Sequence, residues 1–151
     1  MSVEKIGRYE VTGELGKGAM GIVYKAEDPT IGRTVAVKTT RLDVHGMDED
    51  ELIRRFRHEA RAAGALHHSS IVTIYDAGQH GELFYIAMEY VEGETLQRLL
   101  RNHRFTPQEV LDVARQICSG LDYAHSHGVI HRDVKPANII LTAEGAAKIM
   151  D

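Results

Sequence analysis

Apolar residues recur at every second position through much of the first forty residues, a spacing that predicts β-strands. Glycine-rich stretches and an Asp-Pro turn divide this part into three strands. Two more strands are predicted further along the chain, on either side of a turn at Gly78 and Gly81. We therefore expect a five-stranded antiparallel sheet with strands at residues 9–15, 21–27, 34–40, 71–77 and 83–89.

Helical spacing of apolar residues appears first between the third and fourth strands and again after residue 94. The first helix is expected over residues 48–66, a short one opens near Thr95, and a long one begins at Thr106-Pro107-Gln108-Glu109. Thr at the N-cap and Glu three positions later form a capping box, which satisfies backbone donors that the helix leaves unpaired. Two short strands follow, at 138–141 and 147–150. The predicted apolar stripe of the long helix consists of Val110, Val113, Ala114, Ile117, Leu121 and Ala124.

Glu59 carries a carboxylate in the apolar stripe of the predicted helix at 48–66. On a helical wheel it falls among Leu52, Phe56, Ala63 and Leu66. An ionised carboxylate is costly to bury without a cation, and Lys38, at the end of Val35-Ala36-Val37-Lys38, is the natural candidate. A structural ion pair, or a Glu59 that reaches the edge of the helix, would fit the same pattern.

Gly16-Lys17-Gly18-Ala19-Met20-Gly21 has the form G-x-G-x-x-G. In a dinucleotide-binding fold this motif would open a helix, but here the strand Ile22-Val23-Tyr24-Lys25-Ala26 follows. That context favours a hairpin whose backbone amides lie against phosphates, because glycine has no Cβ to keep them apart. A tight hairpin without a ligand remains the alternative.

The segment from His131 to Asn138 matches H-R-D-x-x-x-x-N at each fixed position. This spacing suits phosphoryl transfer, with Asp133 accepting or orienting the proton of a substrate hydroxyl and Asn138 reaching a phosphate-bound magnesium. Lys135 would add positive charge near the transferred group. The sequence therefore predicts a catalytic loop that uses ATP and Mg²⁺.

Length, charge and cysteine content narrow the classes of function. The 151 residues suit one domain, and a formal charge of −4 gives no basic excess for binding nucleic acid. A single cysteine, Cys118, excludes an internal disulfide, and we expect it to be a small core residue of the long helix. A cytosolic location is expected. His125, His127 and His131 fall across a helix end and a loop, which does not favour a zinc site.

Together, and in this order, these motifs resemble those of eukaryotic-type protein kinases, most closely the bacterial serine/threonine kinases of the Hanks type. The resemblance runs from Tyr9 to Asp151 and includes Met88-Glu89-Tyr90-Val91. It implies an α+β, protein-kinase-like fold, with a nucleotide-binding N-lobe over residues 1–89 and a hinge and first part of a C-lobe over 90–151. It also implies transfer of the γ-phosphoryl group of ATP to Ser or Thr of protein substrates, in signal transduction.

The same resemblance implies roles for individual residues. Lys38 would anchor ATP with Glu59 as its helix partner, Asp133 would be the catalytic base, and Asn138 and Asp151 would bind metal. Arg132 resembles the arginine that reads activation-loop phosphorylation. The implied nucleotide contacts are Gly16, Gly18 and Gly21 at the phosphates, Met88 as gatekeeper, Glu89 to Val91 as hinge, and Leu15, Val23, Ala36 and Ile140 around the base.

Asp151 matches the first residue of the family's D-F-G motif, so we expect the chain to be part of a longer kinase. Much of the cover of the long helix is then expected to lie in sequence beyond residue 151. The resemblance also allows for autophosphorylation, dimerisation or a membrane anchor in the complete protein. Two alternatives stay open, a truncated pseudokinase that acts as a nucleotide- or protein-binding regulatory module, and a small-molecule kinase.

Overall fold

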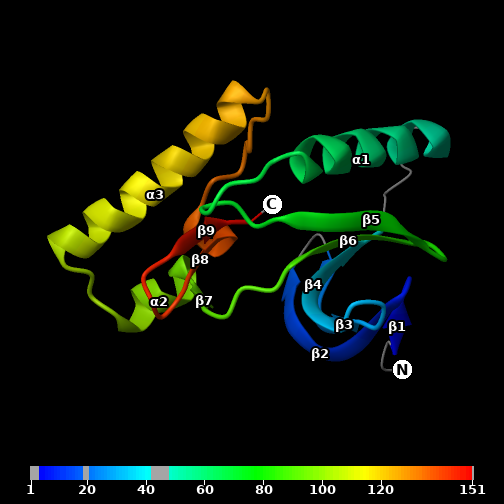
Figure 1. Cartoon of the computed structure of the whole chain (residues 1–151), viewed down its shortest axis with the longest axis horizontal. Helices are drawn as coiled ribbons and strands as arrows, with labels where there is room; N and C mark the ends of the chain where they lie inside the picture. The colour runs from blue at the N-terminus through cyan, green and yellow to red at the C-terminus, as the bar shows by residue number, and fades with distance from the viewer. Residues whose placement is uncertain (1–3, 19–20, 42–47, 151) are drawn as a thin grey trace. The chain divides into compact units, whose positions relative to one another are not determined.

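The computed structural model describes residues 4–18, 21–41 and 48–150, and has an α+β fold (Figure 1). The chain separates into two compact units. The first comprises the residues up to Ala65 together with Ile74–Tyr90, and the second comprises Leu66–Thr73 and the residues from Val91 onward. Each unit contains its own antiparallel sheet.

The sheet of the first unit contains the five predicted strands and one more at its edge. The strand order is β1-β2-β3-β4-β6-β5. The additional strand, β1, has two residues, too few for a pattern to be recognised in the sequence. The strands are β1 (Lys5–Ile6), β2 (Tyr9–Gly18), β3 (Gly21–Asp28), β4 (Arg33–Thr40), β5 (Ile74–His80) and β6 (Leu83–Glu89).

One face of this sheet forms the core of the first unit, and its opposite face carries Lys38. Lys38 is in register with Val23 and Ile86, and Ala36 is in register with Lys25 and Met88. Residues directly opposite one another on paired strands point to the same side, so these residues share what we call the Lys38 face. The core on the other side consists of Ile6, Tyr9, Tyr24, Ala26, Val35, Val37, Tyr85 and Ala87.

A polar cluster of Arg8, Tyr9, Asp28 and Asp76 connects the beginning of β2 with β5. The hydroxyl of the fully buried Tyr9 donates to Asp76 at 3.1 Å, and burial raises the pKa of Tyr9, so the hydroxyl stays protonated. Arg8 contacts Asp28 at 3.3 Å. Burial raises the pKa of Asp28, but the backbone hydrogen bond from Thr30 and the Arg8 charge outweigh it and hold that pKa below its ordinary value.

Helix α1 (Glu49–Gly64) packs against the sheet and runs beside β5 (Figure 1). The ring of Phe56 meets that of Phe84 edge-on, with centroids 5.2 Å apart. Phe84 precedes Ile86 by two residues in β6, so α1 covers part of the Lys38 face. The helix ends at Gly64, and Leu66, expected in its stripe, belongs to the second unit.

The second unit combines two helices with a small sheet of order β7-β8-β9. The predicted capping box is present: the Thr106 hydroxyl accepts from the Glu109 amide at 3.2 Å, and the Glu109 carboxylate accepts from the Thr106 amide at 2.8 Å. The elements are β7 (Glu94–Thr95), α2 (Leu96–Asn102), α3 (Pro107–Ser126), the 3₁₀ turn η1 (Pro136–Asn138), β8 (Ile139–Leu141) and β9 (Ala147–Ile149).

The predicted strand at 71–77 is wrong at its beginning. The amide of Ile149 donates to the carbonyl of Ser70 at 2.8 Å, and the amide of Val72 donates to that of Ile149 at 3.0 Å. The segment around Ile71 therefore pairs with β9 in the second unit, and β5 begins only at Ile74. The apolar character of Ile71 and Val72 reflects this distant pairing.

The predicted buried face of α3 also needs correction. Val113 and Ala124 are buried, but Val110 is 53% exposed and Ala114 is exposed. Cys118 is exposed as well, because it lies about 140° around the helix from Val113 at ~100° per residue. In the stretches of chain that the structure describes, none of the helices has the length and apolar character needed to cross a bilayer.

Candidate active site

The segment between α3 and β8 brings three polar side chains together around Asp133. The ammonium of Lys135 lies 3.0 Å from a carboxylate oxygen of Asp133. The side-chain amide of Asn138 donates to the Asp133 carbonyl at 2.9 Å and to its carboxylate at 3.3 Å. The turn η1 reverses the chain so that Asn138 returns to Asp133. The structure thus groups the three residues that the motif predicted.

Asp133 is placed to act as an ionised acceptor. Its side chain is 58% exposed, so it is open to a ligand. The hydrogen bond from Lys135 has the largest effect and lowers the pKa of the Asp133 carboxyl. Burial opposes it, and the charge of Lys135 and the hydrogen bond from Asn138 lower the pKa further. Asp133 is therefore ionised at neutral pH. The side-chain amide nitrogen of Asn138 donates its hydrogen bonds to Asp133, so the side-chain oxygen stays available to bind a cation.

His131 links this loop to the residue after β9. The Asp133 amide donates to Nδ1 of His131 at 3.1 Å, so Nδ1 carries no proton, and the proton on Nε2 is donated to the Met150 carbonyl at 2.6 Å. Arg132, between them, has φ of 67°, and among the residues described it is the one non-glycine with positive φ. Sequence reasoning missed this bridge, because Met150 is 19 positions away.

The glycine hairpin in the first unit joins β2 and β3. Gly18 pairs with Gly21, and a Cβ at Gly21, where φ is 141°, would collide with the carbonyl oxygen of Thr39. Gly21 is therefore required by the fold. A Cβ at Gly16 or Gly18 would meet nothing within 4 Å. The protein's own packing gives no reason for these two glycines, which suits a backbone that a ligand approaches closely.

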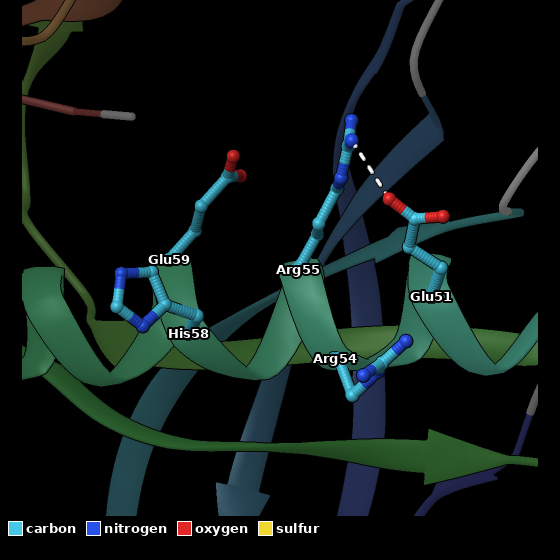
Figure 2. Close-up of a pocket in the computed structure, with 5 residues that line it drawn as sticks. All are labelled: Glu51, Arg54, Arg55, His58 and Glu59. Atoms are coloured by element: carbon cyan, nitrogen blue, oxygen red, sulfur yellow. Dashed lines mark hydrogen bonds and ion pairs between the residues drawn. The ribbon is translucent and has the colours of Figure 1, made fainter.

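The expectation that Glu59 is buried is wrong. Glu59 is exposed and lines a shallow pocket of about 340 Å³ on the outer surface of α1. Figure 2 shows the Glu59 side chain rising from the same side of α1 as Arg55, separate from the Arg55–Glu51 ion pair, whose atoms are 2.9 Å apart. Among the described residues, the ion pairs do not include one between Glu59 and Lys38; Lys38 is half-buried and has other contacts.

The physical reason lies in which apolar residues define the buried stripe of α1. Ile53 is half-buried and Ala60 is buried, and neither was used to place the stripe. Including both moves the centre of the stripe around the helix and leaves Glu59 at its edge. Leu66, which pulled the predicted centre toward Glu59, is not in the helix.

The other predicted nucleotide contacts divide between the two units. Val23, Ala36 and Met88 lie on the Lys38 face, with Ala36 6% and Met88 7% exposed, and Glu89 ends β6. Leu15 is exposed in β2. In the second unit, Val91 and Ile140 are half-buried, and Ile140 is paired with Thr95 and Lys148. Asp151 lies outside the described residues.

A further contact on the Lys38 face was not predicted. The ammonium of Lys25 lies over the ring of Tyr90, 4.6 Å from its centroid. The available signal was a lysine in register with Ala36 on an otherwise largely apolar face, next to the segment expected to be the hinge.

Comparison with known proteins identifies the family of this chain. The model of the protein kinase domain family matches residues 9–151. The chain belongs to the protein kinase family. The kinase assignment predicted from the motifs is thereby confirmed, as is the α+β kinase-like fold.

Bacterial kinases are among the similar proteins. The chain is 43% identical over 146 residues to the serine/threonine-protein kinase PrkC of Bacillus subtilis, and 43% identical over 149 residues to PknB of Mycobacterium tuberculosis. These alignments cover 96% and 95% of the chain but 22% and 24% of the relatives. The crystal structure of the M. tuberculosis PknI kinase domain matches with a TM-score of 0.83 and 32% identity, over the whole chain and 61% of that structure.

Proposed function

We propose that the complete protein containing this kinase chain is an ATP-dependent protein serine/threonine kinase that acts in signal transduction. The observation that carries the proposal is the Asp133 cluster: an exposed carboxylate, ionised at neutral pH, with Lys135 at 3.0 Å and Asn138 beside it. The printed names of the relatives, which are serine/threonine-protein kinases, support Ser and Thr as the acceptors.

In this mechanism, Asp133 orients the substrate hydroxyl and accepts its proton, because the carboxylate is ionised and reachable. Lys135 offers positive charge beside it, where charge develops during transfer. Asn138 would hold Mg²⁺ through its amide oxygen, and Asp151 is proposed as a second ligand. When bound, ATP with Mg²⁺ supplies the phosphoryl group to be transferred.

We assign phosphate binding and the hinge residues Glu89 and Tyr90 to the first unit, and the catalytic loop to the second. The exposed residues Gly16 and Gly18 would let the hairpin backbone approach phosphates closely, and Lys38, in register with Val23 of β3, would add a cation. A cytosolic location, a membrane anchor beyond residue 151, and autophosphorylation or dimerisation stay predictions. The proposed adenine contacts are Leu15, Val23, Ala36, Met88, Glu89, Val91 and Ile140.

A pseudokinase that binds nucleotide or protein without transferring phosphate is the second candidate. The exposed carboxylate of Glu59 favours it, since this residue was expected to be buried as part of the nucleotide site. Against it stand the intact Asp133, Lys135 and Asn138, which a protein without catalysis would not need.

The deciding experiment replaces Asp133 by Asn in the complete protein. We expect phosphate transfer to itself or to a test protein to be lost, because the amide cannot accept the proton, while ATP binding persists. Asp122→Asn, the same change at an exposed position of α3, is the matched control and should retain transfer. Unchanged transfer by Asp133→Asn would refute the mechanism, and an inactive unmodified protein that binds ATP would favour the pseudokinase.

A further inference from the structure

Lys25 places a second cation on the Lys38 face. It is in register with Ala36, two positions along β3 from Val23, and its side chain is half-buried. Its ammonium is 4.6 Å from the ring centroid of Tyr90, within the distance at which a cation and an aromatic ring attract each other. The contact joins β3 to the chain segment that follows β6.

Tyr90 is the first residue of that segment beyond the β4–β6 ladder. The ladder ends at the pair Val35–Glu89, and Tyr90 itself is in neither strand nor helix. The contact of its half-buried ring with Lys25 therefore holds this segment to β3 at the point where the backbone pairing of β4 and β6 ends. The backbone next to it, at Glu89, is where the proposed function puts recognition of adenine.

We propose that Lys25 is a positioning residue for nucleotide binding, which it promotes by holding Tyr90 and the adjoining backbone at Glu89 in the binding conformation. The inference rests on the proposed function. When a site is competent only part of the time, its apparent affinity falls in proportion to the competent fraction. A partly exposed cation–π contact is strong enough to change that fraction about two- to five-fold.

Direct binding of phosphate by Lys25 is the competing explanation, and it makes a different prediction. If the ammonium contacted phosphate itself, removal of the Tyr90 ring would leave its contribution intact. In the positioning role, Lys25 and Tyr90 act as one unit, so removing either removes the whole effect, and removing both adds little.

The test is an ATP titration by calorimetry on a set of matched variants. Lys25→Gln and Tyr90→Leu should each raise the Kd for ATP about two- to five-fold. Lys25→Arg and Tyr90→Phe, which keep the cation and the ring, should bind as the unmodified protein does. The double variant Lys25→Gln/Tyr90→Leu should be no weaker than the weaker single variant. Lys5→Gln, an exposed lysine on β1, is the control for loss of charge.

Three outcomes would overturn the inference: unchanged binding by Lys25→Gln, a double-variant loss equal to the product of the single losses, or a Lys25→Arg variant as weak as Lys25→Gln. In the complete kinase, the KM for ATP should rise by the same factor while kcat stays within about two-fold. If the unmodified protein does not bind ATP, the proposed function fails and this inference with it. Binding that none of these variants changes would overturn this inference alone.

Discussion

Alanine substitution at three glycines of the β2–β3 hairpin separates a phosphate-binding loop from an ordinary tight turn. Gly21 has positive φ and faces the Thr39 carbonyl, whereas a Cβ at Gly16 or Gly18 would project into open space. The protein fold therefore explains one glycine of the motif and leaves the other two to be explained by a ligand.

The expected magnitudes follow from these surroundings. Gly21→Ala should lower the free energy of unfolding by at least about 1–3 kcal/mol, the cost of holding a side-chain residue in a backbone region that glycine alone adopts readily, and the collision of the new Cβ with the Thr39 carbonyl adds to it. Gly16→Ala and Gly18→Ala should leave stability unchanged or raise it by up to about 1 kcal/mol, because alanine restricts the unfolded chain. Each should weaken ATP binding by about 1.5–3 kcal/mol, roughly 10- to 150-fold, by obstructing a charge-assisted hydrogen bond.

Two measurements on the same samples test this contrast, urea unfolding followed by circular dichroism and ATP titration by calorimetry. Gly64→Ala, at the end of α1, is the matched control, because it also introduces a Cβ into open space but lies outside the proposed site. If Gly16→Ala and Gly18→Ala bound ATP as tightly as the control, the hairpin would be a turn and not a phosphate site. If Gly21→Ala were as stable as the control, the structural explanation for that glycine would be wrong.

Three further predictions concern single contacts. Thr106→Ala should cost about 1 kcal/mol in the free energy of unfolding, measured in urea, because it removes half of the capping box, and Thr106→Ser should restore most of it. Tyr9→Phe should cost about 1.5–3 kcal/mol in the same assay, since it removes a hydrogen bond to the charged Asp76; a loss under about 0.5 kcal/mol would contradict this. Lys135→Met should raise the pKa of Asp133, so the acid limb of the kcat/KM profile should move to higher pH, and a carboxyl carbon NMR titration of Asp133 should show the same direction.

Features that depend on neighbouring residues were predictable from the sequence. The bounds of β6 match the predicted strand at 83–89, and both hydrogen bonds of the capping box join residues three positions apart. The Asp133 cluster is equally local, because its members lie within five positions of one another.

Features that depend on distant contacts were not predictable. Ile71 pairs with Ile149, and no pattern near residue 71 indicates this partner. Glu59 was misplaced for a related reason. Which side of a helix is buried depends on what the helix packs against, and α1 packs against Phe84 by way of Phe56. A small rotation of the helix therefore changes whether a residue at the edge of the stripe is buried or exposed.

The spacing of five between Asp133 and Asn138 has a structural reason as well as a chemical one. Within this interval, η1 closes through a hydrogen bond from the Asn138 amide to the Lys135 carbonyl at 2.9 Å, and Pro136 suits the first position of the turn. The carbonyl of Asn138 then accepts from the Met150 amide at 2.8 Å, while the Met150 carbonyl accepts from His131. Asn138 is thus fixed at its amide, its carbonyl and its side chain. One residue more or fewer in the turn would move the Asn138 side chain relative to Asp133 and its backbone amide relative to Lys135, so the spacing suits the structure of the loop as well as its chemistry.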